Sequence, residues 1–559
     1  MNAIVEEGAK FSENVLSPLN QSGDEEGCKW SEDGVKTPDG FAAAYQQYVA
    51  GGWPALAAET EHGGQGMPGL LGIIMTELTG TANWSWGMYP GLSHGAIRTI
   101  EEHGSDEQKS QYLTKLIDGS WTGTMCLTEA QCGTDLGLLR TKAEPRSDGS
   151  YAITGTKIFI SAGEHDMAEN IVHIVLARLP DAPEGTKGIS LFIVPKSMAT
   201  ADGSVGARNA VHCASIEHKM GIKGSATCVM NFDDATGYLI GEPNKGLACM
   251  FTFMNTARLG TAVQGLAHGE LSYQGALEYA RDRLAMRSLT GPKNPDGAAD
   301  PIIVHPDVRR MLLTQKAFAE GSRAFIYFLA QLGDIVEAGT EEEAKHADDL
   351  MAFLTPIAKA FVTETGYESA NLGVQVYGGH GFISEWGMEQ IVRDCRIAML
   401  YEGTTGIQAM DLIGRKVLGS GGKLLLSFTG YLDEFCEQNA GEDNAEFVDV
   451  LKAYKEEWLE LSMKIGEAAM ENPDAAGSAA VDYLMYSGYV TLAYFWGRMA
   501  ILAKAKIAEA DGDVSFYEAK LMTARFYFER LLPRTLTLKQ TMLSDPDYIM
   551  AMPEAMFDF

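Results

Sequence analysis

The segment around Glu402 places one carboxylate between apolar side chains and a run of small residues. Met399, Leu400 and Ile407 are expected to exclude water from Glu402, and desolvation raises the pKa of a carboxyl group towards the range in which a general base works. Gly403 and the two threonines after it leave room for a large planar cofactor to approach the backbone. A glutamate in a helix-capping turn has similar neighbours, so the rest of the chain must decide between the two interpretations.

A second group of candidate residues lies in the segment 125–135, MCLTEAQCGTD, where a strand is expected to run into a turn. Backbone amides and hydroxyl groups in such a turn can bond a phosphate oxygen or the polar edge of a ring system. An ordinary strand-to-loop junction is the alternative interpretation. The segment 157–163, KIFISAG, alternates like a strand end and is predicted to present Phe159 and Ser161 on one face. There the aromatic ring can stack on a cofactor while the serine bonds the cofactor's edge.

Composition limits the partners that the protein can have. The 559 residues are enough for roughly three to four domains. With 44 basic and 75 acidic side chains, the net charge of -31 argues against a nucleic-acid partner and against attraction to anionic lipid. Apolar runs such as Tyr489–Trp496 are too short to span a membrane.

Cysteine usage and the N-terminus indicate the compartment. The eight cysteines form no CxxC pair and no metal-ligand spacing, so we predict no metal site and no structural disulfide. Residues 1–10 show neither a secretory signal nor a transit peptide. These observations predict a reduced, cytoplasmic protein.

Hydrophobic spacing changes twice along the chain. Helical spacing dominates both ends, whereas short β-rich runs such as 151–160 and 189–194 occur between them. A Gly- and Pro-rich stretch at 288–301 predicts a loop between helices. We therefore predict an α+β protein with an N-terminal helical domain (1–120), a middle β-barrel-like domain (121–242), a four-helix bundle (243–418) and an extra C-terminal helical domain (419–559).

Four motifs in a fixed order make the pattern specific. They are TEAQCGTD (128–135), KIFIS (157–161), QVYGGHGF (375–382) and YEGTTGIQ (401–408). With them the chain resembles the acyl-CoA dehydrogenase family over about residues 40–418. The strings 163–170 and 211–219, together with the C-terminal extension, resemble a large subfamily that includes dehydrogenases of 3-methylmercaptopropionyl-CoA. The resemblance implies FAD as cofactor.

The resemblance also implies which residues contact the flavin cofactor. The implied residues are Met125, Leu127, Thr128, Gly133, Thr134, Phe159, Ser161, Arg283, Gln375, Gly378, Gly379 and Thr404. Arg283 and the segment 375–379 match positions at which family members meet the dinucleotide across a subunit interface, so a homo-oligomer is expected, with a dimer favoured. Taken alone, Arg283 is also typical of a solvated helix arginine, and a bare GGxG is more typical of a turn.

For the CoA thioester, the resemblance implies contacts from five residues. These are Ser225, Asn255, Arg258, Tyr401 and Gly403. Arg258 would supply the cation that a nucleotide phosphate or adenine requires. Some family members carry the catalytic glutamate in this helix, but Ala257 stands at that position here, which leaves Glu402 as the candidate base.

The activity implied is the α,β-dehydrogenation of an acyl-CoA. Glu402 would take the α-proton while a hydride leaves the β-carbon for the flavin, and fixed donors would polarise the thioester carbonyl. An electron-transferring flavoprotein would then accept the electrons. The subfamily implies conversion of 3-methylmercaptopropionyl-CoA to 3-methylthioacryloyl-CoA in dimethylsulfoniopropionate breakdown. The alternatives are a general short- or medium-chain acyl-CoA dehydrogenase and a non-catalytic CoA-thioester-binding protein.

Two further features remain open at the level of sequence. Ala130 and Cys132 replace the Pro and Ala that are common in the family turn, which predicts a looser turn. Met75, Trp84 and Met88 could line a cavity for a thioether chain through sulfur contacts, but a stripe at helical spacing is more typical of plain core.

Overall fold

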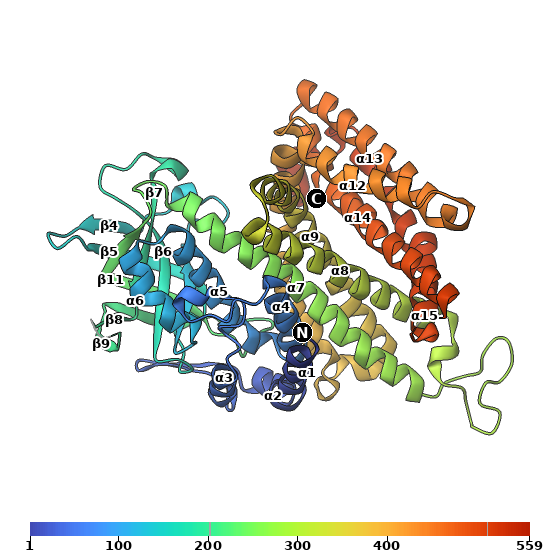
Figure 1. Cartoon of the computed structure of the whole chain (residues 1–559), viewed down its shortest axis with the longest axis horizontal. Coiled ribbons are helices and arrows are strands. Elements are labelled where there is room, and N and C mark those ends of the chain that lie inside the picture. The colour runs from blue at the N-terminus through green and yellow to red at the C-terminus, as the bar shows by residue number, and fades with distance from the viewer. Residues whose placement is uncertain (201–202, 511) are drawn as a thin grey trace. The chain divides into compact units, whose positions relative to one another are not determined.

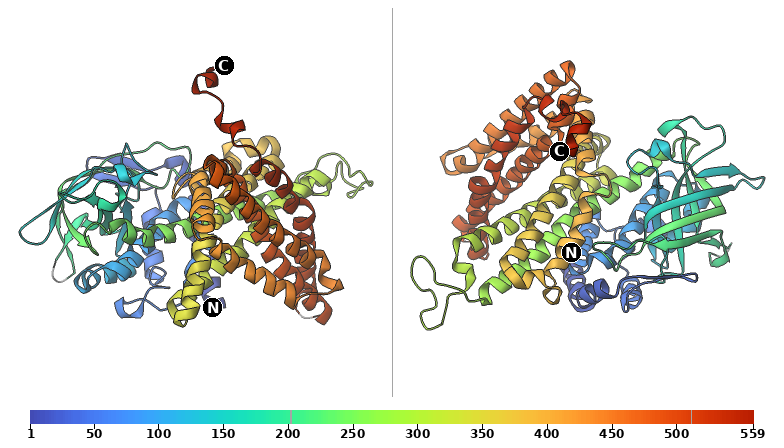
Figure 2. Two further views of the ribbon diagram at one scale, coloured as in Figure 1. Left: turned by 90° about the horizontal axis from the view of Figure 1, so that it is seen from above. Right: turned by 180° about the vertical axis from the view of Figure 1, so that it is seen from behind.

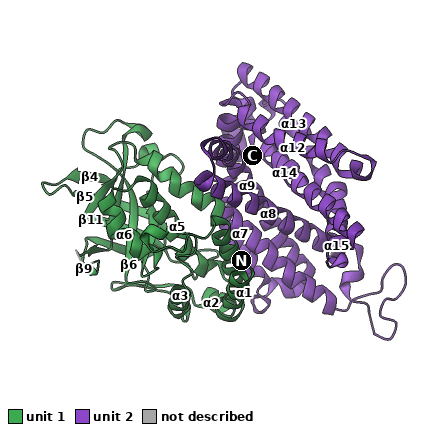
Figure 3. Ribbon diagram, viewed as in Figure 1, with its two compact units in different colours: residues 1–260 green, residues 261–559 purple. Residues whose placement is uncertain are grey.

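The computed structural model describes residues 1–200, 203–510 and 512–559 (Figure 1). The chain divides into two compact units, unit 1 (residues 1–260) and unit 2 (residues 261–559), and the division falls within helix α7 (Gly246–Asp282) (Figure 3). Unit 1 contains helices and the β-sheet, and unit 2 is helical. The predicted α+β fold is confirmed.

The first half of unit 1 is mainly helical. Its helices are α1 (Asn2–Phe11), α2 (Pro18–Glu26), α3 (Phe41–Ala50), α4 (Gly69–Ala82), α5 (Trp84–His103) and α6 (Asp106–Ile117). Helix α6 begins with a capping box, in which the Ser105 side chain accepts from the Gln108 amide and the Gln108 side chain accepts from the Ser105 amide. A short hairpin of β1 (Lys29–Ser31) and β2 (Gly34–Lys36), which the sequence pattern did not indicate, interrupts the helices.

The middle of unit 1 is a sheet that closes on itself. Its strands are β3 (Trp121–Cys126), β4 (Lys142–Pro145), β5 (Tyr151–Ser161), β6 (Asn170–Arg178), β7 (Ile189–Pro195), β10 (Val211–Ile216) and β11 (Thr227–Ile240), beside a small hairpin of β8 (Ser197–Ala199) and β9 (Val205–Arg208). Strands β6, β7, β11, β5 and β4 pair in a ring that the Lys142–Arg178 contact closes, while β10 and β3 extend it. This arrangement confirms a barrel-like domain.

Alternate residues of β6 face two different hydrophobic cores. Val175 and Ala177 belong to one core, while Ile174 and Leu176 belong to another that includes Leu113 of α6. Since both faces of the strand are covered, its sequence is apolar throughout rather than alternating.

Unit 2 is helical and contains both long and short helices. After the shared α7 these are α8 (Pro306–Ala338), α9 (Glu341–Tyr377), α10 (Met388–Arg396), α11 (Thr405–Met410), α12 (Lys423–Gln438), α13 (Ala445–Glu471), α14 (Asp474–Glu509), α15 (Val514–Phe526), α16 (Thr535–Met542) and α17 (Asp547–Met550). The predicted loop lies between α7 and α8 and projects from the helices in both views of Figure 2. Within the described residues, no helix has the length and hydropathy needed to cross a bilayer.

Two glycines allow α7 and α9 to approach closely. A Cβ atom on Gly265 would lie 2.4 Å from the Val362 carbonyl oxygen, and one on Gly366 would lie 2.3 Å from the Gly265 carbonyl oxygen. Any larger side chain at either position would force the two helices apart. This crossing brings side chains of α7 and α9 to the same neighbourhood.

The C-terminal extension packs directly on the helices that precede it. The Trp496 indole nitrogen on α14 donates to the Ala317 carbonyl at 3.1 Å, and Arg534 makes two hydrogen bonds of 2.8 Å to Glu368 of α9. The extension is therefore continuous with the core of unit 2. Its last residues leave the helices and end in an exposed Phe559 (Figure 2).

Candidate active site

A tight turn follows β3 in unit 1. The Glu129 and Cys132 backbones exchange two hydrogen bonds, of 2.9 and 3.0 Å, which enclose the residues between them. Gly133 and Thr134 follow on the surface, both exposed. The loose turn expected from the missing proline is therefore wrong, because these backbone bonds close the turn without it.

A buried ion pair supports this turn from beneath. The Lys157 amine lies 2.8 Å from a Glu129 carboxylate oxygen and 2.9 Å from the Leu127 carbonyl oxygen, and both charged side chains are buried. Glu129 also accepts from the Thr141 hydroxyl at 2.6 Å and from the Arg140 amide at 2.7 Å. Burial raises the pKa of Glu129, but the Lys157 charge and these hydrogen bonds outweigh it and lower the pKa to about 2.

Sequence reasoning missed this ion pair. Its signal was present, because Lys157 is a lysine inside an apolar strand end and Glu129 is an acid within the preceding motif. Buried charges are normally paired, so a lysine at a core position requires a carboxylate partner.

A β-bulge re-aims Phe159. Met230 of β11 pairs with Lys157 and Cys228 pairs with Ile160, so two residues of β5 oppose Val229 alone. Phe159 has a left-handed backbone with φ of 58° and a side chain that is 59% exposed. The alternation of β5 breaks between the buried Lys157 and the exposed Phe159, whereas Phe159, Ile160 and Ser161 are exposed, buried and half-buried in turn, as expected if Phe159 and Ser161 share a face. A strained, exposed aromatic is typical of a binding face.

Three hydrogen bonds join the strand end 157–161 to residues 124–128 at the end of β3. Lys157 donates to the Leu127 carbonyl, the Ile158 amide donates to the Thr128 carbonyl at 2.9 Å, and the Thr124 hydroxyl donates to the Ser161 carbonyl at 2.6 Å. The exposed Phe159 ring thus lies beside a turn whose Thr128 and neighbouring polar groups are partly exposed. These residues fit a flavin, which requires one stacking surface and nearby polar groups for its edge and phosphates.

The predicted CoA residues of unit 1 fall into two places. Asn255 and Arg258 lie one turn apart on α7, with the Arg258 guanidinium 3.3 Å from the Asn255 side-chain oxygen and 5.8 Å from the centre of the Phe251 ring. Ser225 is fully buried, and within the described residues its hydroxyl has no hydrogen-bond partner. A buried hydroxyl without a partner is a candidate ligand contact.

In unit 2, Glu402 also has a left-handed backbone, with φ of 56°. The side-chain amide of Gln408 donates to the Glu402 carbonyl at 2.9 Å, and the Lys359 amine donates to the Gly403 carbonyl at 2.5 Å. The carboxylate side chain therefore leaves a segment whose carbonyl groups are held by other residues.

The residues on either side of Glu402 are also held in place. The Tyr401 hydroxyl donates to Gln264 of α7, whose side chain donates to the Asp394 carbonyl at 3.1 Å. The Thr405 hydroxyl donates to Glu364 of α9 at 2.6 Å.

The Thr404 side chain, a predicted cofactor contact, caps the N-terminus of α11 by accepting from the Ile407 amide. The apolar surroundings expected for Glu402 are only partly present. Met399 is buried, but Leu400 and Ile407 are 48% and 37% exposed, because they lie outside the packed face of this segment.

The predicted partner-facing residues gather at one end of unit 2. The Tyr279 and Tyr377 rings stack at 4.1 Å, which brings the ends of α7 and α9 together. Arg283 follows α7 and is exposed, and Gln375 is exposed in the last turn of α9. Gly378 ends α9 with φ of 60° and ψ of -133°, a conformation that favours glycine, and Gly379 follows it on the surface.

Comparison with known proteins identifies the family. Family models match the chain in four consecutive parts: acyl-CoA dehydrogenase N-terminal domain (2–120), middle domain (124–235) and C-terminal domain (244–418), and an acetyl-CoA dehydrogenase C-terminal-like domain (428–553). A 3-methylmercaptopropionyl-CoA dehydrogenase of Ruegeria pomeroyi is 44% identical over 95% of this chain and 90% of its own length. The chain belongs to the acyl-CoA dehydrogenase family.

Other relatives agree with this acyl-CoA dehydrogenase assignment. A butyryl-CoA dehydrogenase of Syntrophomonas wolfei is 35% identical over 100% of this chain and 93% of its own length. The crystal structure of an acyl-CoA dehydrogenase complexed with FAD from Bacillus anthracis has the same fold, with a TM-score of 0.77 at 21% identity, covering 100% of this chain and 89% of that one. The protein is an FAD-dependent oxidoreductase of this family.

The methionine and tryptophan stripe of this acyl-CoA dehydrogenase is core. Met75, Trp84 and Met88 are 5%, 9% and 8% exposed. A Cβ atom on Gly8 would lie 2.8 Å from the Met75 sulfur, so α1 covers this methionine. The Met75 sulfur therefore packs against α1, which agrees with the alternative interpretation that the stripe is plain core.

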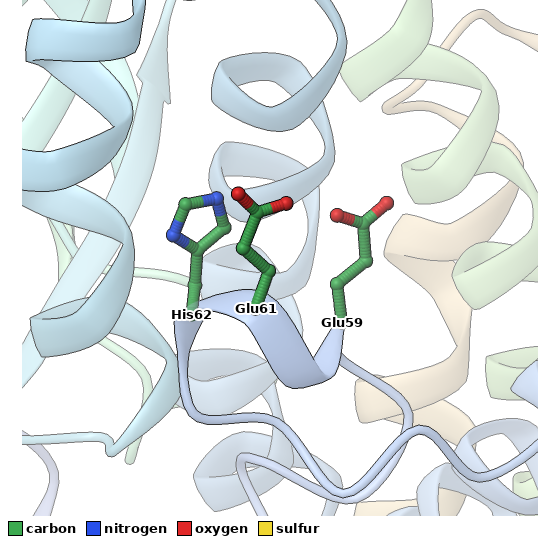
Figure 4. A group of neighbouring side chains, drawn as sticks. All are labelled: Glu59, Glu61 and His62. Atoms are coloured by element: carbon green, nitrogen blue, oxygen red, sulfur yellow. The ribbon is translucent and has the colours of Figure 1, made fainter.

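One surface group resembles a metal site by geometry. Glu59, Glu61 and His62 bring three ligand atoms within 4.8 Å of one another on a short helical turn (Figure 4). Both glutamates are exposed, and exposed acidic groups are common in the absence of a metal. We assign no metal to this group.

Proposed function

We propose that this acyl-CoA dehydrogenase desaturates 3-methylmercaptopropionyl-CoA to 3-methylthioacryloyl-CoA, a reaction of dimethylsulfoniopropionate breakdown. The substrate is supported by the Ruegeria pomeroyi relative, which is 44% identical, against 35% for the butyryl-CoA dehydrogenase. The reaction itself is supported by one observation, the Glu402 carboxylate on a strained segment whose residues on both sides are held by hydrogen bonds.

In the proposed reaction Glu402 is the general base. Its carboxylate takes a proton from the α-carbon of the thioester, and its backbone amide donates to the thioester oxygen, on which negative charge develops. FAD, when bound, accepts the hydride that leaves the β-carbon as the C=C bond forms. Tyr401 and Gly403 flank the base and are proposed to contact the acyl group.

The remaining proposed residues bind the two ligands. Arg258 and Asn255 are proposed to hold the nucleotide part of CoA, and the buried Ser225 hydroxyl to bond the ligand as well. The proposed FAD residues are Met125, Leu127, Thr128, Gly133, Thr134, Phe159, Ser161 and Thr404, with Arg283, Gln375, Gly378 and Gly379 acting across a homodimer interface. The dimer, the cytoplasmic location and the electron-transferring flavoprotein as acceptor stay predictions.

The first test is anaerobic bleaching of the bound flavin by acyl-CoA. We expect wild-type protein to bleach with 3-methylmercaptopropionyl-CoA, and Glu402→Gln to bleach about 10²- to 10⁴-fold more slowly with unchanged flavin content, since only the base is lost. Glu437→Gln, an exposed glutamate of α12, is the matched control and should bleach normally. An active Glu402→Gln variant would refute the base assignment, and a protein without flavin would favour a non-catalytic CoA-thioester-binding protein.

A straight-chain substrate is the second candidate. The butyryl-CoA dehydrogenase relative spans the whole chain, and the structure places the methionine stripe in the core. A panel of butyryl-, hexanoyl- and 3-methylmercaptopropionyl-CoA compares kcat/KM directly. Equal kcat/KM values for all three substrates would indicate a general short-chain acyl-CoA dehydrogenase rather than an enzyme for the thioether substrate.

A further inference from the structure

Two buried side chains hold consecutive carbonyl groups beside the proposed base. Gln408 of α11 donates to the Glu402 carbonyl, and Lys359 of α9 donates to the Gly403 carbonyl. We name this pair of donors the carbonyl clamp. Both side chains are 0% exposed, so the clamp is inside the protein rather than on its surface.

The carbonyl clamp acts on a backbone that is strained at Glu402. Glu402 and Gly403 have φ of 56° and 87°. A left-handed backbone is unfavourable for a residue with a Cβ atom and persists only where the surroundings enforce it. The direction of each carbonyl is set by ψ of its own residue, so fixing both carbonyls fixes the path of the chain on the C-terminal side of Glu402.

Gly403 and Gln408 depend on each other. A Cβ atom on Gly403 would lie 2.7 Å from the Gln408 side-chain nitrogen. A side chain at position 403 would therefore displace the donor that holds the Glu402 carbonyl. The glycine leaves the space that this donor requires.

Lys359 is an energetically unfavourable residue at this fully buried position. Burial of an amine costs several kcal/mol unless fixed acceptors compensate it, and apolar residues fill most helix cores at no such cost. It projects from α9, which α7 contacts closely at Gly265 and Gly366. The donor therefore comes from a rigid helix pair and can hold the Gly403 carbonyl at one place.

We propose that Lys359 and Gln408 are positioning residues for α-proton abstraction, holding Glu402 in its reactive conformation without touching the substrate. The proposal rests on the assignment of Glu402 as the base. A misplacement of about 1 Å in a reacting group can reduce a rate about 10²-fold. Loss of either donor should therefore slow proton abstraction while leaving FAD and CoA binding in place.

The experiment compares Lys359→Met and Gln408→Leu with wild type in rapid anaerobic flavin reduction. Each variant is expected to lower the reduction rate per flavin-loaded site by about 10- to 100-fold with little change in KM. α-Deuterated substrate should give a larger isotope effect than in wild type, since proton abstraction becomes more rate-limiting. The double variant should lose less than the product of the two single losses, because both donors hold the same segment.

Thr365→Val is the matched control. Thr365 is also buried on α9, but its hydroxyl donates to the Phe361 carbonyl of the same helix. The Thr365→Val variant should be less stable, but the rate of flavin reduction and the isotope effect of the flavin-loaded protein should not change.

The outcomes separate the possible roles. If the clamp variants lose only stability or flavin content, and the loaded protein keeps the wild-type rate and isotope effect, the proposal is wrong. Gln408→Leu provides the same test if Lys359→Met does not fold. An active Glu402→Gln variant overturns the base assignment and the clamp with it, whereas an inactive Glu402→Gln beside normal clamp variants overturns the clamp alone.

Discussion

Phe159 in unit 1 and Glu402 in unit 2 have nearly the same positive φ angle but are held in different ways. Their φ angles are 58° and 56°. Phe159 lies in a strand bulge beside the buried Glu129–Lys157 ion pair. Glu402 lies between helical segments, and side-chain donors from α9 and α11 hold the carbonyls of Glu402 and Gly403.

This difference predicts which changes should disrupt each site. The sheet site depends on two opposite charges in the core, so it should be sensitive to acid and to removal of one charge. The helical site depends on hydrogen bonds to backbone carbonyls, so it should lose geometry before it loses stability. A sheet fixes strained residues through strand register, whereas helices must reach them with side chains.

Removal of one charge in unit 1 should have the largest effect on stability. Glu129→Gln leaves the Lys157 ammonium buried without its carboxylate, and we expect a loss of about 3–5 kcal/mol in the free energy of unfolding. Urea unfolding, monitored by the release of flavin, measures this loss in the free energy of unfolding. The double variant Glu129→Gln with Lys157→Met should recover part of the loss, and equal stability of the single and double variants would contradict a role for the unpaired charge.

Acid should weaken unit 1 through the same carboxylate. The folded pKa of Glu129 is about 2, below the ordinary 4.5, so ionised Glu129 stabilises the folded state above pH 4.5. This contribution should be lost as the pH falls from 4.5 towards 2. The stability difference between wild type and Glu129→Gln, measured by urea unfolding, should narrow over this range. A constant difference would show that Glu129 does not carry the effect.

Relief of backbone strain should give the smallest effect, at both strained positions. Glycine adopts positive φ without penalty, so Phe159→Gly should be more stable than Phe159→Ala, and Glu402→Gly more stable than Glu402→Ala, by about 1 kcal/mol each. Thermal unfolding of the flavin-free proteins measures this difference. Alanine as stable as glycine at either position would show that the strain is already relieved there.

The sequence predicted the order of structural regions and the main chemical groups. Hydrophobic spacing indicated helices at both ends of the chain and β-rich runs between them, of which 151–160 and 189–194 lie in β5 and β7. The four motifs indicated the acyl-CoA dehydrogenase family, which the comparisons confirm. The role of Glu402 stays a prediction until the variants are measured.

Several expectations failed in detail. The turn after β3 is closed by its own backbone hydrogen bonds without proline, the alternation of β5 breaks at the bulge between Lys157 and Phe159, and Leu400 is half exposed. The sequence signal for the Glu129–Lys157 pair, a lysine inside an apolar strand end, did not by itself identify the partner, and no local pattern indicated the carbonyl clamp.

The sequence by itself thus determined the residue types, the motif order and the periodicity of helices and strands. Tertiary structure alone decided that Lys157 lies under Glu129 and that Lys359 reaches the carbonyl of Gly403, a residue 44 positions further along the chain. Local patterns report which face of an element is apolar, because that depends on neighbours three or four residues away. Strand register and helix crossing decide which distant polar groups meet, and these depend on the packing of the whole unit.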